Sequence, residues 1–543
     1  MEDLREILET GLARGGRLLT AGERHVVHAM LALSPDALRW WARLTQRTFE
    51  SYPRAELPAD VAAELTTAGL IDALVTSATR LSRATVDELR SAARAAGLSP
   101  RGNRDALIER LQGRFAPTDP WYRIRHRGLI LRLERWAALS RAPDRSLAIV
   151  ERLGFVRWPR YALTPGPGLW PTRRAMLRWE RLLADHERRE PAENLADIAA
   201  GVHRAPGRLD LGRRVLRAIA DAARLRERAG ALAEARDLYC RLVDHGAPAG
   251  DLALRVARTL EAEGQPHAAF AWLTDHRPDP RAEPDAAVEI TRVGRRLART
   301  LGRGWAPDAP LVDAAERSWT LPAGAPVANR PGWRVDARDL PVEAALVARL
   351  AAHGRVAVHA EGQLWTTLFA LLFADLYFLP VDGALPVARL TGPLDLGTPA
   401  FAARRRPHVD AVLSAITAGE AHDRIVDADA RWRGCRLAGA AWHVLDGASL
   451  AAVAGSLGPQ GLTAVMERLL QSWRVSRGLP DLVVLPGDPV RLPDAFPSRL
   501  GPGLQLAEVK GPADSLRPEQ RVWADVLKRA GAPIEWWWVK PAA

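Results

Sequence analysis

The sequence contains almost no cysteine. Cys240 and Cys435 are the only two in 543 residues, and they lie far apart in the chain. Neither a disulfide framework nor a cysteine-based zinc site can therefore be built from this chain alone. Such a composition fits the reducing cytoplasm.

Long hydrophobic runs are also missing. The longest, roughly Leu364 to Leu379, is interrupted by Asp375 and falls short of the ~20 apolar residues that a membrane span needs. The first residues, MEDLREILETGL, are acidic and amphipathic, which is not the pattern of a secretory signal. We therefore expect a buried helix at 364–379 and no membrane partner.

Lysine is the third scarce residue, because it occurs only at Lys510, Lys528 and Lys540. The bias towards Ala, Arg, Gly and Pro is typical of a GC-rich bacterial genome, and it makes each retained lysine more informative. Arginine supplies most of the 76 basic residues, which outnumber the 64 acidic ones and give a net charge of +12. A basic chain attracts polyanions, so DNA is the leading partner, but +12 over 543 residues is only mildly basic. Motifs must decide the function.

The N-terminal third has helical periodicity. Ser34 can cap a helix from Pro35 to Thr48, and a further helix is expected near Val61 to Leu70, which suits a winged-helix-like module. Farther along, Thr85 can cap the first of two short helices joined by GLSPRGNR. This pair resembles a SAP module, in which Arg101 and Arg104 would contact DNA phosphates. The alternative is a plain helical hairpin.

The middle of the chain mixes arginine with aromatic residues and then becomes repetitive. Between 121 and 190 the mixture suits a DNA groove, although many of these residues can equally be core aromatics beside solvated arginines. From 210 to 300, glycine, alanine and large apolar residues recur after 34 positions, the period of tetratricopeptide helical hairpins. The Pro-, Ala- and Gly-rich segment 303–332 is interpreted as a connector.

The chain is long enough for several domains, and these patterns predict five regions. They are a helical, winged-helix-like module at 1–78, a SAP-like hairpin at 79–118, a basic and aromatic helical region at 119–200, helical repeats with the connector at 201–332, and an α/β domain at 333–543.

The last region contains the residues that suggest chemistry. Glu361 stands between a short apolar strand and an apolar helix, where it either caps the helix or binds a ligand. Asp481 heads the strand Leu482 to Leu485. Glu508 and Lys510 are two apart on another strand, so they point to the same face. A helix follows that strand, and its periodicity carries Gln520 towards the strand end.

Phosphodiester hydrolysis requires residues of these types. Carboxylates hold Mg²⁺ or Mn²⁺, which stabilises charge on a phosphate and lowers the pKa of an attacking water. A neighbouring lysine can orient that water or stabilise the charge of the transition state. A lone E-x-K is a weak signal, whereas a Pro-Asp strand start followed by EVK, in a chain with three lysines, is a strong one.

The segments GLPDLVVL and EVKGPADSL, with Gln520 to Trp523 beyond them, resemble the VRR-NUC version of the PD-(D/E)XK nuclease fold, a mixed sheet flanked by helices. The SAP-like hairpin, the repeats, HAEG and RRRPHVDAVL extend the resemblance to the Fanconi-associated nuclease family over nearly the full length. The resemblance implies a structure-specific nuclease that cuts 5′-flap and branched DNA and trims in the 5′–3′ direction during interstrand cross-link repair.

The resemblance also implies a set of site residues and one or two Mg²⁺ or Mn²⁺ ions. The metal ligands would be Glu361, Asp481, Glu508 and the Val509 carbonyl, with Lys510 as the catalytic lysine. Relatives with an N-terminal ubiquitin-binding zinc finger differ, since this chain lacks the cysteines for one. Recruitment through ubiquitin is therefore not implied.

Three further hypotheses accompany this reading. Arg404, Arg405 and Arg406 are a candidate pocket for a 5′-terminal phosphate, because forked guanidinium groups match phosphate oxygens. A Holliday-junction resolvase is the alternative enzyme, and it would need two matched active sites. A catalytically silent DNA-binding scaffold is the alternative without chemistry, although none of the expected site residues is missing.

Overall fold

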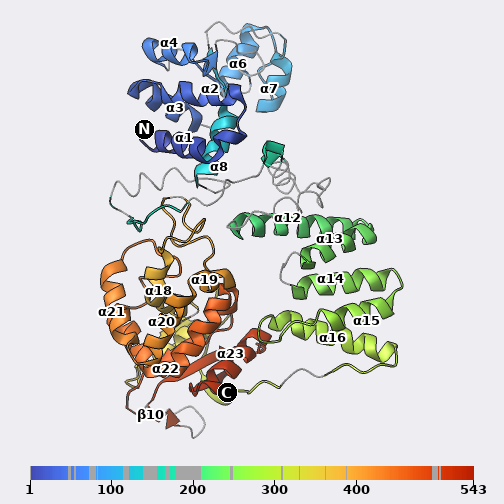
Figure 1. Ribbon diagram of the computed structural model, residues 1–543, viewed down its shortest axis with the longest axis vertical. Coiled ribbons are helices and arrows are strands. Elements are labelled where there is room, and N and C mark those ends of the chain that lie inside the picture. Colours follow the sequence, from blue (N-terminus) through green and yellow to red (C-terminus); the bar gives the residue numbers. More distant parts are fainter. Residues whose placement is uncertain are drawn as a thin grey trace. The chain divides into compact units, whose positions relative to one another are not determined.

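The structure is a computed structural model. It describes residues 2–46, 51–53, 57–72, 81, 84–113, 121–138, 154, 156–164, 172–174, 176–177, 209–244, 249–306, 310–328, 330–360, 362–386, 388–488, 490–491, 499–500 and 503–542. The chain divides into two compact units (Figure 1). Unit 1 comprises Met1–Arg152 and Gly168–Met176, and unit 2 comprises Leu153–Pro167 and Leu177–Ala543.

Unit 1 is mainly helical, as predicted. Its elements are α1 (Glu2–Gly15), α2 (Ala21–Leu31), α3 (Pro35–Gln46), β1 (Ser51–Pro53), α4 (Ala59–Thr67), β2 (Ile71–Asp72), α6 (Val86–Ala95), α7 (Arg104–Leu111), β3 (Trp121–Ile124) and α8 (Arg127–Ala138). The three short strands form one antiparallel sheet with β3 in the middle. Ser34 caps α3 as expected, because its Oγ accepts a hydrogen bond from the backbone N–H of Ala37 at 3.2 Å.

The predicted two-helix hairpin is present as α6 and α7. Thr85 and Glu88 form a capping box at the start of α6, and the Asn103 side chain caps α7. The two helices bury a small apolar cluster that includes Leu89 and Leu107. A local core with a cap at each helix start explains why so short a segment folds into a defined hairpin.

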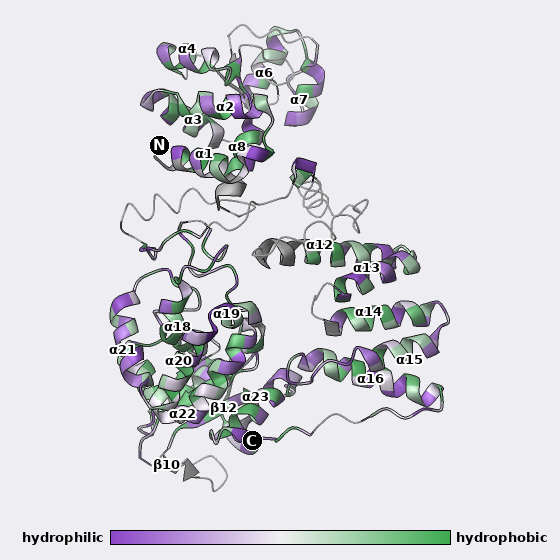
Figure 2. Cartoon of the chain, viewed as in Figure 1, coloured by the Kyte–Doolittle hydropathy of each residue, from purple (hydrophilic) through white to green (hydrophobic). Residues whose placement is uncertain are grey.

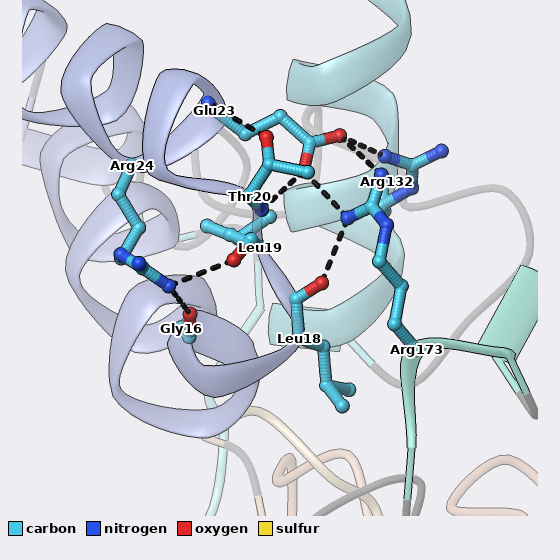
Figure 3. A network of polar contacts seen from close by, with 8 residues as sticks. All are labelled: Gly16, Leu18, Leu19, Thr20, Glu23, Arg24, Arg132 and Arg173. Carbon is cyan, nitrogen blue, oxygen red and sulfur yellow. Dashed lines mark hydrogen bonds and ion pairs between the residues drawn. The ribbon is translucent and has the colours of Figure 1, made fainter.

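A carboxylate in α2 joins separate parts of unit 1 (Figure 3). Glu23 forms the capping box of α2 with Thr20 and accepts hydrogen bonds from Arg132 of α8 and from Arg173. Arg173 also donates to the Leu18 carbonyl at 2.7 Å. Burial alone would raise the pKa of Glu23, but the hydrogen bonds from Arg173 and Thr20 lower this pKa to about 2. The ionised carboxylate therefore fastens the segment around Arg173 to α2.

The first elements of unit 2 that the structure describes are stacked helices (Figure 1). They are α12 (Leu209–Arg228), α13 (Leu232–Asp244), α14 (Ala249–Ala262), α15 (Pro266–Asp275) and α16 (Pro284–Thr300). Gly230 and Gly264, which are 34 positions apart, have φ angles of 82° and 74° in the turns after α12 and α14. The sequence recurrence therefore corresponds to equivalent left-handed turns between helices, a conformation that favours glycine.

The second part of unit 2 is built on a five-stranded mixed sheet, which confirms the predicted fold. Its order is β4 (Ala315–Leu321), β13 (Ile534–Pro541), β12 (Gln505–Lys510), β9 (Leu482–Val484) and β8 (Ala357–His359). The first three strands are mutually parallel, and β9 is antiparallel to both β12 and β8.

The interpretation of 303–332 as a connector is wrong. This segment contains β4, which pairs along its whole length with the C-terminal strand β13, and it contains β5 (Ala323–Val327). Strand β5 forms a second, antiparallel sheet with β6 (Arg330–Val335) and β7 (Arg338–Leu340). The sheet of the last domain therefore starts before residue 333. Proline and glycine suggested a loop, whereas the partner strand that stabilises β4 lies more than 200 residues away in sequence.

Helices cover both faces of the five-stranded sheet. One face packs against α18 (Gln363–Tyr377), α20 (Arg406–Thr417), α21 (Ala421–Trp432), α22 (Gly447–Gln471) and α23 (Pro518–Arg529), and the other packs against α17 (Val342–Ala351). Along β13, Trp536 joins the first core and Trp537 the second, as strand periodicity requires.

The predicted buried helix at 364–379 is α18, which is mostly hydrophobic in Figure 2. Among the described residues, no helix is both long and apolar enough to cross a membrane. The remaining elements of unit 2 are α19 (Pro399–Arg404) and the two-stranded hairpin of β10 (Val490–Arg491) and β11 (Arg499–Leu500).

Candidate active site

Two of the predicted carboxylates meet at the end of neighbouring strands. Leu482 of β9 lies opposite Ala507 of β12 in the antiparallel register, so one step further places Asp481 opposite Glu508. The Asp481 carboxylate accepts a hydrogen bond from the backbone N–H of Val509 at 2.9 Å. This bond holds the aspartate against the strand that carries the glutamate.

Glu508 and Lys510 share one face of β12, as the strand period predicted. Lys510 Nζ lies 2.7 Å from Glu508 Oε1, and the side chains of Lys510 and Glu508 are only 9% and 2% exposed, respectively. Val509 between them points into the opposite core. A buried acidic and basic pair therefore faces the helices that cover this side of the sheet.

Gln520 also contacts Glu508. Its Nε2 donates to Glu508 Oε1, while its Oε1 accepts a hydrogen bond from the Arg517 backbone at 2.8 Å at the start of α23. The second contact fixes which end of the amide faces the carboxylate. The helix itself is anchored by Trp523, whose indole N–H donates to the Val475 carbonyl at 2.5 Å. The predicted placement of Gln520 beside the strand end is thus observed.

The electrostatics of the site favour binding of a cation. Burial, followed by the negative charge of Asp481, raises the pKa of Glu508 to about 8, although Lys510 opposes the shift. Glu508 Oε2 is buried and has no hydrogen-bond partner among the described residues. A divalent ion would satisfy this oxygen and offset the repulsion between the carboxylates. Carboxylate oxygens are the ligands that Mg²⁺ and Mn²⁺ prefer, so the residues fit such an ion.

Within the part of the chain that the structure describes, no group of three metal-ligating side chains is found. The predicted ligand Glu361 lies outside the described residues. Its neighbours are described. The Ala360 N–H donates to the Asp481 carbonyl at 2.7 Å, and Gly362, with a φ of 76°, is the N-cap residue of α18. The chain on one side of Glu361 is therefore fixed against Asp481.

One buried residue behind the site was not anticipated from the sequence. The Arg468 guanidinium of α22 lies 5.1 Å from the Trp523 ring centroid, and burial lowers the pKa of this arginine to about 10. No sequence signal marks Arg468, because its partner is 55 positions away on another helix. Its contact helps to hold the helix that carries Gln520.

The candidate DNA-binding arginines are placed differently from one another. Arg101 and Arg104 are exposed at the hairpin of α6 and α7, as a phosphate contact requires. The Arg405 side chain is fully buried and pairs with Asp395 at 2.9 Å, so the expectation that it faces DNA is wrong. Its burial follows from its position at the junction of α19 and α20.

The two neighbours of Arg405 also have partners. Arg404, 28% exposed, pairs with the same Asp395, while Arg406, 74% exposed, pairs with Asp410 one helical turn away. The three arginines therefore do not form one continuous patch. A phosphate contact by Arg404 or Arg406 stays a prediction.

Two family models match the chain. A VRR-NUC domain matches residues 417–541, and a SAP domain matches residues 80–115. Similar curated proteins are the Fanconi-associated nuclease 1 homolog of Arabidopsis thaliana, 26% identical over 302 residues, and human Fanconi-associated nuclease 1, 33% identical over 196 residues. These alignments cover 53% and 33% of this chain, but only 32% and 17% of the relatives. The chain thus matches a third or less of the length of either relative.

Solved structures extend the fold similarity over the whole chain. A crystal structure of paFAN1 bound to DNA with a 2-nucleotide 5′ flap and a gap matches with a TM-score of 0.79 and 23% identity, covering 100% of this chain and 98% of that one. A second paFAN1 structure, with a 1-nucleotide 5′ flap, has a TM-score of 0.75. Together these similarities show that the chain contains a VRR-NUC domain and a SAP domain, is similar in sequence to Fanconi-associated nucleases, and shares the fold of the paFAN1 structures.

Proposed function

We propose that this chain is a divalent-metal-dependent DNA nuclease that cuts 5′-flap and other branched DNA. The observation that carries the proposal is the buried cluster of Asp481, Glu508 and Lys510, in which one carboxylate oxygen lacks a hydrogen bond and the glutamate pKa is raised. Further support comes from relatives that are named nucleases and from similar structures that contain flap DNA.

Asp481 and Glu508 would hold the ion, together with Glu361 and the Val509 carbonyl, and Mg²⁺ or Mn²⁺ suits this oxygen-rich set. One or two ions are compatible with these ligands. When bound, such an ion stabilises charge on the phosphate and lowers the pKa of water.

The other residues of the site have positioning and electrostatic roles in this proposal. Lys510 would donate hydrogen bonds to the reacting phosphate or orient the attacking water, because its ammonium group is already held beside the carboxylates. Gln520 would keep the Glu508 side chain in one orientation through its contact with Oε1.

DNA binding would rest on phosphate contacts made by residues other than the carboxylates and Lys510. We propose that Arg101 and Arg104, at the SAP-like hairpin, contact phosphates, and that Arg404 or Arg406 contacts a 5′-terminal phosphate. Capture of a 5′ end would allow trimming in the 5′–3′ direction. Repair of interstrand cross-links is the process proposed from the family.

The test is a panel of labelled duplex, 5′-flap, 3′-flap and four-way-junction DNA with Mg²⁺, Mn²⁺ or EDTA. The wild type should cut 5′ flaps only with metal. Asp481→Asn and Lys510→Met should lower the rate at least about 100-fold while DNA affinity changes only a few-fold. Lys540→Met, which alters an exposed lysine on β13, is the matched control.

Each alternative has its own outcome in the same panel. Symmetric cutting of the four-way junction by a dimer would support a resolvase, and tight binding without cutting under any metal would support a scaffold. Wild-type cutting by both Asp481→Asn and Lys510→Met would refute the assignment of the site.

A further inference from the structure

A buried arginine lies at the end of the sheet opposite the carboxylates. Arg355 precedes β8 and is 1% exposed. Among the described residues, its guanidinium donates to three backbone carbonyls: Nη2 to Leu485 at 2.6 Å and to Gly503 at 3.1 Å, and Nη1 to Asp488 at 3.4 Å. The side chain thus uses its forked geometry to bind backbone from separate segments.

These carbonyls lie where the chain leaves one strand and approaches the next. Leu485 directly follows β9, and Gly503 is two residues before β12. Between them the chain makes a long excursion that includes the hairpin of β10 and β11. A connection of this length restrains the relative position of β9 and β12 only weakly. Arg355 binds the chain at both ends of the excursion.

The register of these strands decides where the candidate ligands point. Strands β8 and β9 have only three residues each, so few backbone hydrogen bonds fix their pairing. A slip of one residue turns every side chain of a strand to the opposite face. Such a slip of β9 against β12 would move Asp481 away from Glu508. The same applies to β8, which leads through Ala360 to Glu361.

Burial of the cation has an energetic cost. Desolvation lowers the pKa of Arg355, and the negative charge of Asp488 opposes this effect. The contacts of Nη1 and Nη2 with carbonyls replace part of the lost hydration, because carbonyl oxygens are strong acceptors for a charged donor. A buried charge is by itself weak evidence for stability. Its distinctive effect here is geometric, since it joins the approach to β8, the end of β9 and the approach to β12.

We propose that Arg355 is a positioning residue that fixes the mutual register of β8, β9 and β12 and so sets the spacing of the metal-binding carboxylates at their far ends. This inference rests on the proposed function of the site. It assigns to Arg355 no contact with DNA, metal or the reacting atoms.

The test compares Arg355→Lys with Arg433→Lys in the full chain. Lysine keeps the charge but cannot span three carbonyls. Arg433 is a suitable control because it also binds two carbonyls, those of Trp442 and Leu445, at a helix end away from these strands. Loss of free Mn²⁺ signal in electron paramagnetic resonance measures metal binding without cleavage, and flap cutting is measured in parallel.

Arg355→Lys should raise the half-saturating Mn²⁺ concentration at least about 5-fold and lower kcat at least about 10-fold. DNA affinity in EDTA should stay within about 2-fold, since it depends on remote phosphates. Arg433→Lys should leave Mn²⁺ binding unchanged, even if it lowers the melting temperature equally. A folded Arg355→Lys with wild-type Mn²⁺ binding and kcat would overturn the proposal.

A second variant covers the case in which Arg355→Lys does not fold. A Cβ added at Gly487 would meet Arg355 Cδ and Nε at 3.3 Å, so Gly487→Ala displaces the guanidinium slightly without removing its charge. It should raise the half-saturating Mn²⁺ concentration about 2-fold or more, and an unchanged value would reject the inference. If the wild type neither binds Mn²⁺ nor cuts DNA, the proposed function fails and this inference fails with it. If it does both and the variants match it, only this inference fails.

Discussion

Replacement of Glu508 by glutamine should stabilise the metal-free protein at alkaline pH while abolishing cleavage. Burial and the charge of Asp481 raise the pKa of Glu508 from 4.5 to about 8. Glutamine has nearly the same shape and keeps a carbonyl oxygen for Lys510 and Gln520, but it cannot ionise. The variant therefore removes the cost of a buried negative charge.

The sign and size of the effect follow from proton linkage. Below pH 4.5 the glutamate is protonated in both the folded and the unfolded chain, and no cost arises. As the pH rises to about 8 the unfolded chain loses its proton first, so the wild type loses stability through this window. A pKa difference of about 3.5 corresponds to a loss on the order of 5 kcal/mol. In the variant, Lys510 loses its charged partner, and this loss reduces the stabilisation.

Thermal unfolding in EDTA at pH 5, 7 and 9 measures this effect. A domain of roughly 200 residues shifts by about 2–4 °C per kcal/mol, so Glu508→Gln should melt at least about 5 °C above the wild type at pH 9 and close to it at pH 5. Added Mn²⁺ should stabilise the wild type more than the variant. A melting difference that stays constant from pH 5 to 9 would refute the reasoning.

Three further predictions concern other parts of the chain. Asp285→Asn removes a carboxyl whose pKa is raised to about 6, chiefly by a hydrogen bond with Glu519 of α23, so the gain in melting temperature should appear as the pH rises from 3.8 to 6. Because Asp285 is largely exposed, we expect a stabilisation of less than about 1 kcal/mol. A gain confined to lower pH would contradict this prediction. Glu23→Gln weakens the contact with Arg173 and should destabilise unit 1 by about 1–2 kcal/mol at pH 7. The difference in stability between the variant and the wild type should vanish as the pH falls from 4.5 to about 2. Hydrogen exchange in α2 can measure this difference. Arg101→Ala with Arg104→Ala should reduce the slope of log affinity against log salt by about 1.8, at ~0.9 per lost phosphate contact, and an unchanged slope would remove the hairpin from the DNA interface.

The fold could be predicted from the sequence where local patterns decide it. Caps at Ser34 and Thr85, and the apolar period of 364–379, gave helices that the structure contains. Strand β4 was missed because a strand is stabilised by its partner, and the partner here is the last strand of the chain. Composition near β4 suggested a loop, and no local rule can reveal a pairing of such sequence separation.

The candidate site also combines contacts that local sequence patterns predict with contacts that depend on distant segments. The shared face of Glu508 and Lys510 follows from the two-residue period of one strand, and the approach of Gln520 follows from the helix directly after it. The position of Asp481 opposite Glu508 depends instead on the register between β9 and β12. That register is set by contacts between distant segments, including those of Arg355, and could be expected only from the family resemblance.

Arginine shows why charge alone is a poor guide to the proposed DNA interface of this chain. Nearly all of its positive charge is arginine, yet Arg355 and Arg405 are each 1% exposed and bind backbone carbonyls inside the domain. Arg405 stands in the most basic-looking run of the last domain, yet its position at the junction of α19 and α20 buries it beside Asp395. Forked guanidinium groups suit carbonyls as well as phosphates. An arginine in this chain is therefore evidence for DNA binding only where its side chain is exposed, as Arg101 and Arg104 are.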